Sequence, residues 1–417
     1  MSDKKIKVLT ISDHPMLPSG VGTQTKYVIE ALLETGKFEV FSLGGAMKHP
    51  NYNLMKVSDN WRILPVDGYG DKAKVLAILR EFKADILYFM TDPRYYEWLW
   101  QVEDDIRQMV PMVYYHVWDN YPYPLYNKKW YDSNDCIASI SKVTSDIVQT
   151  VAPDVDEKYI PHAVPMEIFK KASPTKLEEV RKNNPGLEGK IVFFWNNRNA
   201  RRKQSGTLVH WYKNFLEQDH VDRTKVALLM HTDPTDPNGQ PLEHIATEIG
   251  LINSEIMFSK GGIPAEDLAL MYGLADCTIN ISDAEGFGLA TLESLSCETP
   301  IIVNMTGGLQ EQVTDGENWF GVGIEPASKA IIGSQAVPYI YEDRISEEDF
   351  IAAMNKIYGM SNEERENLGK LGRQHIEKNY NFKDFKQSWV NLMTEVHEKF
   401  GSWEDRKHYT PWRLEEI

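Results

Sequence analysis

The sequence is poor in cysteine and contains no long apolar run. Its three cysteines, Cys136, Cys277 and Cys297, fall in apolar stretches without a C-x-x-C pair. They therefore predict small buried side chains in a reducing compartment, and neither a disulfide framework nor a metal site. No apolar run approaches the roughly 18 residues of a membrane span, and the N-terminus lacks the pattern of a signal peptide. We expect a cytoplasmic protein, with peripheral membrane contact left open.

The sequence also has fewer basic than acidic residues. It contains 45 Lys and Arg residues and 61 Asp and Glu residues, which gives a formal net charge of −16. Such a molecule as a whole repels nucleic acids and anionic membranes, which disfavours a nucleic-acid partner. A local basic patch would not show in this total. The 417 residues, 42% hydrophobic and 25% charged, are ordinary for a globular chain and predict two or three domains. The oligomeric state stays open.

Short apolar stretches alternate with helical patterns over residues 1–170. The first strand, at 5–12, leads into a loop that contains Gly20 and Gly22, and a helical pattern follows from Thr23 to Gly36. This order opens a doubly wound α/β fold. The loop forms either a plain tight turn or a backbone surface close to a phosphate. Further strands are predicted at 38–43, 61–66, 85–90, 111–116 and 135–139.

Aromatic residues gather between positions 95 and 131, and about half of them should belong to the core. Trp118, Tyr121 and Tyr123 follow the strand at 111–116, at the carboxyl end where open α/β sheets bind ligands. Their flat faces would suit stacking on the ring of a bound ligand. His116 closes that strand, and a lone histidine there is either a structural residue or a ligand contact.

A charged stretch with proline and glycine at 171–189 predicts a linker, followed by a second α/β domain at 190–390. Its first strand, at 190–196, leads into a loop with four cations in six residues. These are Arg198, Arg201, Arg202 and Lys203. The run is either a solvated loop, a nucleic-acid patch or a pair of phosphate ligands.

The stretch 275–304 organises the second domain. An apolar strand at 275–282 runs into E-G-F-G, then into a helical pattern, and a second strand follows at 301–304. A glycine turn that opens onto a helix N-terminus offers free N–H groups and a positive dipole end, which suits a diphosphate. Glu285 lies in the turn and Glu293 in the helix. Two glutamates eight residues apart are by themselves more typical of an acidic surface.

The full order of strand, E-G-F-G, helix with glutamate, strand and Thr306-Gly307-Gly308 closely resembles the donor-binding segment of retaining GT-B glycosyltransferases. The resemblance is to the large sucrose-synthase and mannosyltransferase type family, also called glycosyltransferase family 4. It implies an α/β GT-B fold with two Rossmann-like domains that face a cleft. It also implies that residues 391–417 form a helical tail that crosses back to the first domain.

The resemblance also implies roles by position. The expected catalytic residues are His116 beside the transferred sugar, Arg198 and Lys203 on the diphosphate, and Glu285 on the sugar hydroxyls. Glu293 is expected to bind the nucleotide ribose. The other expected donor-binding residues are Gly20, Gly22, Gly262, Gly286, Phe287, Gly288 and Leu289. Trp118, Tyr121 and Tyr123 are the expected acceptor-binding residues.

These expectations describe a metal-independent enzyme without a cofactor. It would move a sugar from a nucleoside diphosphate sugar, of the UDP class, to a hydroxyl of a glycan, a lipid-linked or a small-molecule acceptor. One alternative is a phage-type transferase that acts on hydroxymethylated DNA bases, and another is a non-catalytic sugar-nucleotide-binding protein. The sequence does not name the sugar, the base or the acceptor. It also leaves the loop at 231–240 and the insertion at 328–344 without a role.

Overall fold

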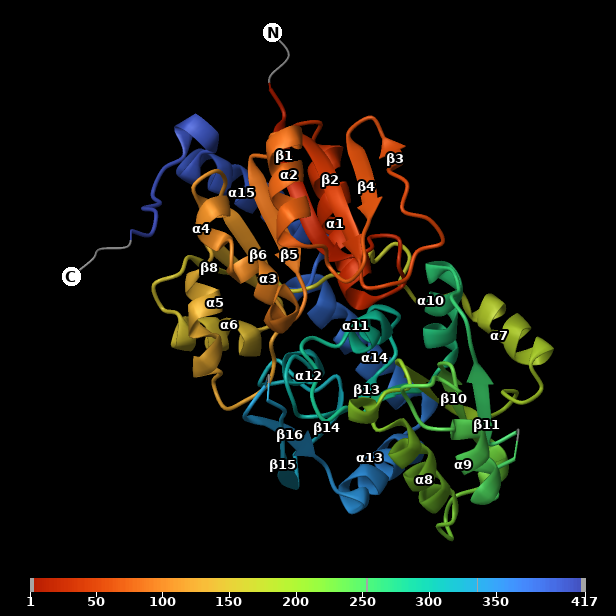
Figure 1. Cartoon of the computed structure of the whole chain (residues 1–417). Coiled ribbons are helices and arrows are strands. Elements are labelled where there is room, and N and C mark those ends of the chain that lie inside the picture. Colours follow the sequence, from red (N-terminus) through yellow and green to blue (C-terminus); the bar gives the residue numbers. More distant parts are fainter. Residues whose placement is uncertain (1–3, 253, 336, 414–417) are drawn as a thin grey trace. The chain divides into compact units, whose positions relative to one another are not determined.

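The computed structural model describes residues 4–252, 254–335 and 337–413, and the chain forms two compact units. The first unit contains the residues up to His162 together with those from Lys383 onward, and the second contains Ala163–Phe382. Each unit is built on its own twisted sheet with helices packed against it (Figure 1). No helix among the described residues is long and apolar enough to span a bilayer.

The first unit holds an eight-stranded sheet in the order β3-β4-β2-β1-β5-β6-β7-β8. All neighbouring strands are parallel except β3, which pairs antiparallel with β4 at one edge. The strand β3 is only four residues long and all four are exposed, which explains why its pattern did not predict a strand. The strands are β1 (Ile6–Asp13), β2 (Phe38–Gly45), β3 (Met55–Ser58), β4 (Trp61–Pro65), β5 (Ile86–Met90), β6 (Met112–His116), β7 (Cys136–Ser139) and β8 (Glu157–Tyr159).

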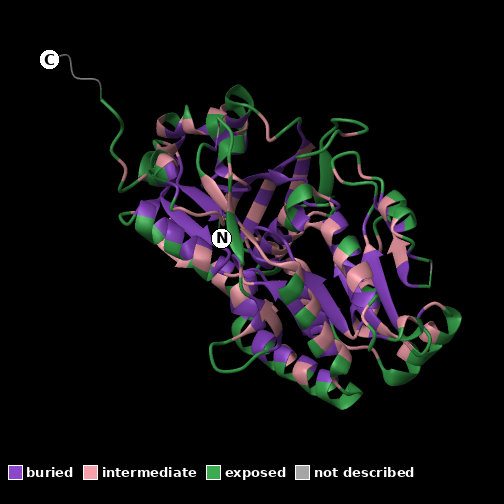
Figure 2. Cartoon of the chain, turned by 90° about the horizontal axis from the view of Figure 1, so that it is seen from below, coloured by how far each residue is buried: buried purple, intermediate pink, exposed green. Residues whose placement is uncertain are grey.

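Most helices of the chain present one buried and one exposed face (Figure 2). The strands β5 and β6 are buried along their whole length, as apolar strands of a parallel sheet covered on both faces should be. Side chains cap the helix starts: Ser19 caps α1, Asp71 caps α2 and Ser141 caps α6. The helices are α1 (Gly20–Glu34), α2 (Lys72–Phe82), α3 (Glu97–Trp100), α4 (Glu103–Arg107), α5 (Lys128–Asp132) and α6 (Lys142–Val151).

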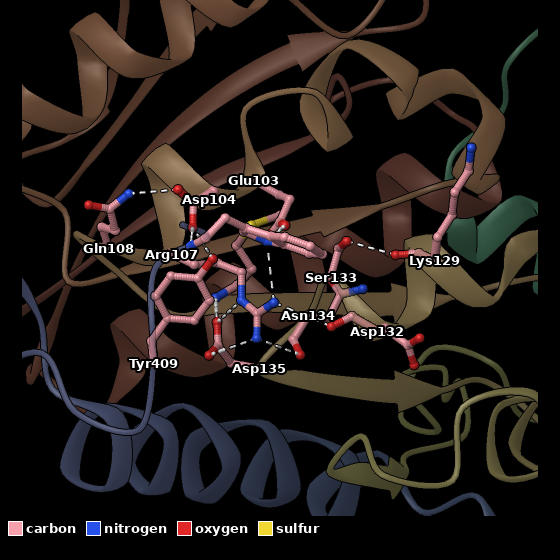
Figure 3. Close-up of polar contacts among 12 residues, drawn as sticks. Glu103, Asp104, Arg107, Gln108, Lys129, Asp132, Ser133, Asn134, Asp135 and Tyr409 are labelled. Carbon is pink, nitrogen blue, oxygen red and sulfur yellow. Dashed lines mark hydrogen bonds and ion pairs between the residues drawn. The ribbon is translucent and has the colours of Figure 1, made fainter. Parts of the chain in front are cut away.

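The C-terminal part of the chain completes the first unit. Helix α15 (Phe382–Phe400) places Trp389 against Tyr88 and Tyr115, with ring centroids 5.4 and 4.7 Å away. Farther on, the ring of Tyr409 lies 4.6 Å from the Arg107 guanidinium, and its hydroxyl donates to Asp104 at 2.6 Å (Figure 3). Apolar packing and polar contacts therefore both fix this part of the chain. Residues 414–417 of the predicted tail lie outside the described residues.

The second unit holds a six-stranded parallel sheet in the order β11-β10-β9-β12-β13-β14, and a separate antiparallel hairpin, β15–β16. Its strands are β9 (Ile191–Asn196), β10 (Val226–His231), β11 (Ile256–Ser259), β12 (Cys277–Asn280), β13 (Ile301–Asn304), β14 (Gly321–Ile324), β15 (Ser328–Ile332) and β16 (Ile340–Arg344). Its helices are α7 (Pro174–Asn183), α8 (Ser205–Leu216), α9 (Leu242–Glu248), α10 (Ala265–Leu274), α11 (Leu289–Ser296), α12 (Leu309–Val313), α13 (Glu347–Gly359) and α14 (Asn362–Asn379).

The bounds of the units differ from the predicted domains 1–170 and 190–390. Residues 163–170 belong to the second unit because Arg373 donates to the carbonyl of Phe169 at 2.8 Å, and the Phe169 ring lies 6.5 Å from Tyr272. The predicted linker at 171–189 contains α7 and belongs to the same unit. Residues 383–390 belong to the first unit, where Trp389 is buried.

Candidate functional site

The turn between β12 and α11 is the centre of the candidate site. Gly288 is the N-cap residue of α11 and has a φ of +93°, in the left-handed region that favours glycine. A side chain there would also collide with α12, because a Cβ atom would lie 2.5 Å from Cδ2 of Leu309. Gly286 and Phe287 belong to the same turn, and Leu289 is the first residue of α11. Phe287 is buried and packs edge-on against Tyr380, with 5.7 Å between the ring centroids.

A second glycine pair, Gly307 and Gly308, packs directly on this turn. The N–H of Gly308 donates to the carbonyl of Glu285 at 3.0 Å. A Cβ atom on Gly307 would lie 1.9 Å from that same carbonyl oxygen, so only glycine fits. This contact gives the T-G-G motif at 306–308 a structural role. Its glycines pack on the E-G-F-G turn at 285–288 and support the backbone of that turn.

Glu285 forms an ion pair with Lys203 from the loop after β9. Oε2 of Glu285 contacts the Lys203 ammonium, and the Arg202 guanidinium lies 3.8 Å from the same oxygen. Burial by itself raises the pKa of Glu285, but the positive charges of Lys203 and Arg202 outweigh it and the pKa is lowered. The structure thus brings together two residues that the sequence predicted separately, and it keeps Glu285 ionised.

Glu293 occupies a different environment. Its Oε2 accepts a hydrogen bond of 2.8 Å from the Tyr272 hydroxyl, which in turn accepts one of 2.8 Å from the Asn196 side chain. Burial raises the pKa of Glu293 to about 7, although the hydrogen bond from Tyr272 lowers it in part. The two glutamates of the motif therefore have pKa values shifted in opposite directions.

Arg198 lies away from this pair. Its guanidinium is 65% exposed and pairs with Asp236 at 2.8 Å. The hydrogen bond from Arg198 holds the pKa of Asp236 at about 2. Of the two cations expected on a diphosphate, only Lys203 lies against Glu285. Arg198 instead forms its ion pair with Asp236, in the loop at 231–240.

Gly262 lies in the exposed turn before α10, with no atom within 4 Å of where a Cβ would be. Gly20 and Gly22 begin α1 in the first unit. There the Ser19 hydroxyl donates to Asp13 at 2.6 Å and accepts from the Gly22 N–H at 3.0 Å. Asp13 therefore fixes the start of the glycine loop.

The candidate residues at the end of β6 and after it differ in burial. His116 is 0% exposed, and its Nε2 lies 2.8 Å from the Tyr131 hydroxyl. Burial lowers the pKa of His116 to about 3, so the ring is neutral, and its Nδ1 has no hydrogen-bond partner among the described residues. Trp118 is buried, whereas Tyr123 is exposed and Tyr121 lies edge-on to it at 5.4 Å. Burial favours the structural interpretation of His116.

Sequence reasoning missed Tyr272, Asn196 and Asp13. Asn196 and Asp13 each end a strand, at the sheet edge where ligands bind in open α/β folds, so their positions carried a signal. Tyr272 lies within an ordinary helical pattern, that of α10, and nothing in the local sequence distinguishes it as a site residue.

Comparison with known proteins bears on the family and the fold of the chain. Residues 178–375 match the protein-family model described as "Glycosyl transferases group 1". D-inositol 3-phosphate glycosyltransferase of Frankia alni is 28% identical over 191 residues, which are 44% of this chain and 43% of the relative. The chain thus spans less than half of the length of the curated relatives that it matches.

Solved structures resemble the whole chain. Sucrose-phosphate synthase from Thermosynechococcus elongatus matches with a TM-score of 0.74 and 18% identity, over 95% of this chain and 100% of that one. Anabaena Alr3699/HepE, solved in complex with UDP and glucose, matches with a TM-score of 0.69 and 14% identity, over 94% and 100%. These likenesses confirm the predicted GT-B fold, and residues 178–375 carry a glycosyl transferases group 1 domain.

Proposed function

We propose that this protein is a retaining, metal-independent glycosyltransferase. It moves a sugar from a nucleoside diphosphate sugar to a hydroxyl acceptor. The observation that carries the proposal is the Lys203–Glu285 ion pair, held in the glycine turn beside the N-terminus of α11. A cation, an ionised carboxylate and backbone N–H groups in one turn match the parts of a sugar diphosphate.

Lys203, the two glutamates and the start of α11 each have a chemical task in this proposal. Lysine carries three N–H donors, so Lys203 can contact a phosphate oxygen while it holds Glu285. The second oxygen of Glu285 accepts hydrogen bonds from sugar hydroxyls. Glu293, held through one oxygen by Tyr272, has its other oxygen for the ribose hydroxyls. The N-terminus of α11 adds positive potential at the phosphates.

Transfer would proceed on one face of the sugar. The acceptor oxygen bonds to the anomeric carbon while the bond from that carbon to the phosphate oxygen breaks. The electron pair leaves with the nucleoside diphosphate, and a phosphate oxygen takes the acceptor proton. Lys203 and the helix N-terminus stabilise the charge that grows on the leaving group. No covalent sugar–enzyme intermediate is needed.

We infer a UDP-sugar as donor, because the Anabaena protein of the same fold was solved with UDP and glucose. The test is to incubate purified protein with UDP-, GDP- and ADP-sugars and to measure release of the nucleoside diphosphate with and without acceptor sugars. We expect release from a UDP-sugar and an anomeric configuration that is kept in the product. Inversion of that configuration would overturn the retaining mechanism.

Activity should also survive excess EDTA, because Lys203 and the α11 N-terminus supply the positive charge for the leaving diphosphate. Loss of activity in EDTA, with recovery on adding Mg²⁺, would overturn the metal-independent part of the proposal. Binding of UDP-sugars without any turnover would instead favour the non-catalytic alternative.

The DNA-modifying alternative loses support from the contacts of the basic loop. Arg198 pairs with Asp236, Arg201 with Glu342, and Lys203 with Glu285, all inside the second unit. Arg202 donates to the Ala284 carbonyl. Three of these four cations are balanced by carboxylates of the same unit, so the loop carries little net positive charge for a long polyanion, while a single cation can still contact one phosphate. Titration with duplex and single-stranded DNA at physiological salt should show no binding.

A further inference from the structure

The second unit contains a pocket of about 300 Å³ that the proposed donor site does not use. Arg201 and Gln204 contribute to it from the loop after β9, and Arg344 from the end of β16. The remaining lining comes from the loop after β10. The full lining is Arg201, Gln204, Asn238, Gly239, Gln240 and Arg344. The pocket is therefore lined by residues from both segments for which the sequence predicted no role, 231–240 and 328–344.

Both segments are fixed to the body of the unit. The Asn199 amide donates to the Gln240 carbonyl at 2.7 Å and accepts from the Gln240 N–H at 3.1 Å. On the hairpin, the Asp343 N–H donates to the Asp283 carbonyl at 2.9 Å, and the Thr306 hydroxyl donates to the Asp343 side chain at 2.8 Å. The walls of the pocket are therefore held in place by the protein itself.

The pocket and the donor turn lie on different sides of one short helix. A 3₁₀ helix has three residues per turn, so the consecutive side chains of η3 (Arg201–Lys203) point in three directions. Lys203 contacts Glu285 and Arg202 contacts the Ala284 carbonyl. Arg201 instead makes two hydrogen bonds to Glu342, at 2.7 and 2.5 Å. The pocket is therefore distinct from the proposed diphosphate site.

The chemistry of the lining is cationic. It contains two guanidinium groups, three carboxamides and a glycine, and none of these six residues is acidic. Glu342 and Asp283 stand behind the arginines: Glu342 fixes Arg201, and Asp283 lies 3.5 Å from Arg344. Nε of Arg344 is buried and has no hydrogen-bond partner among the described residues. Arginine with unused donors is the side chain best suited to a planar or tetrahedral anion.

We propose that this pocket binds an anionic group, a phosphate monoester or a carboxylate, on a ligand other than the sugar nucleotide. Two sources share this chemistry. The anion is either a substituent of the acceptor, in which case the inference also rests on the proposed function, or a free effector that binds independently of transfer.

Inorganic phosphate is the probe for the first experiment. Its dissociation constant is measured by calorimetry for wild type, for Arg344→Gln and for the milder variant Asn238→Ala. Arg80→Gln is the charge-matched control, because Arg80 lies at an exposed position of α2. Loss of a charged hydrogen bond should weaken binding about tenfold or more in Arg344→Gln, less in Asn238→Ala, and not in Arg80→Gln. Phosphate binding that survives Arg344→Gln but is lost in Lys203→Gln would place the anion in the donor turn and overturn the proposal. So would the absence of phosphate binding to wild type.

A second experiment separates the two sources. Transfer to a hexose and to its phosphate monoester is compared in wild type and Arg344→Gln. An increase in KM of about tenfold for the phosphorylated acceptor alone identifies an acceptor substituent. A change in donor turnover by free phosphate, equal for both acceptors and lost in Arg344→Gln, identifies an effector. If donor turnover itself is absent, the proposed function fails while the binding experiment still tests the pocket.

Discussion

The Tyr272 hydroxyl donates a hydrogen bond of 2.8 Å to Oε2 of Glu293 and accepts one of 2.8 Å from Asn196. One oxygen of Glu293 is therefore committed to the protein. The arrangement orients the carboxylate and leaves its other oxygen to accept from a ligand. Tyr272 acts through Glu293 in this view and is a positioning residue.

Replacing Tyr272 with Phe should weaken binding of UDP by about 5- to 30-fold at pH 8, where Glu293 is mostly ionised, because it removes one hydrogen bond to a charged group. Affinity for 2′,3′-dideoxy-UDP should stay unchanged, since that analogue lacks the ribose hydroxyls. Calorimetry with both nucleotides measures the difference. Tyr212→Phe is the matched control, because its buried hydroxyl donates to the Glu255 carbonyl elsewhere in the same unit. Equal losses for the two nucleotides would mean that Tyr272 only supports the fold.

The opposite pKa shifts of Glu285 and Glu293 predict opposite effects of pH on stability. The pKa of Glu293 is raised from 4.5 to about 7, so between these values the folded protein keeps a proton that the unfolded chain has lost. Stability falls as pH rises through this window. The variant Glu293→Gln has no group that titrates at this position, so it does not lose stability in this way. The difference between its melting temperature and that of wild type should therefore rise from pH 4.5 to 7 and then level off.

The pKa of Glu285 is lowered, so its ionised form stabilises the folded protein above the ordinary pKa. This stabilisation is lost as pH falls through the folded pKa. Glu285→Gln should therefore melt at a lower temperature than wild type at pH 7, and the gap should narrow only below pH 4.5, as the pH falls through the lowered pKa of Glu285. Parallel curves for the two variants would contradict both assignments.

The periodicity of the sequence predicted most of the fold. Strands that are buried along their whole length, such as β5 and β12, and the glycine turn at Gly288 follow from local pattern. The strand β14 did not, because two of its four residues are glycine. A Cβ on Gly321 would lie 1.9 Å from the Ile301 carbonyl oxygen, so close packing against β13 requires glycine at this position. Glycine is also the residue that makes the strand hard to recognise from its sequence.

The contacts of the candidate site were less predictable than its residues. The family resemblance implied that Arg198 and Lys203 bind one diphosphate together, yet Arg198 pairs with Asp236 and Lys203 pairs with Glu285. The partner of Arg201, Glu342, lies 141 residues away on a hairpin with no expected role. Such pairings depend on how distant loops fold over one another, and a local pattern does not contain that information.

Because their contacts differ, Lys203 and Arg198 should respond differently to removal. Lys203→Met leaves Glu285 without its main counter-charge, which should cost about 1–3 kcal/mol of stability and about 10²–10³ in turnover. Arg198→Met removes an exposed ion pair, for which a cost of about 0–1 kcal/mol is typical. Thermal melts and kcat with a UDP-sugar measure both effects. Equal losses of turnover in the two variants would restore the prediction that both cations bind the diphosphate.

Gly307 should tolerate no side chain, because its Cβ would lie 1.9 Å from the backbone oxygen of Glu285. Gly307→Ala must therefore push the two glycine turns apart, at a cost of about 2 kcal/mol or more, and should weaken UDP binding because Glu285 and Gly288 move. Gly189→Ala is the matched control: its φ of +66° resembles the +50° of Gly307, but nothing lies within 4 Å of the added atom. That variant carries only the cost of the left-handed backbone, about 1 kcal/mol, and should bind UDP normally. Similar melting temperatures and affinities for the two variants would show that backbone conformation, and not the contact between the turns, makes glycine necessary at position 307.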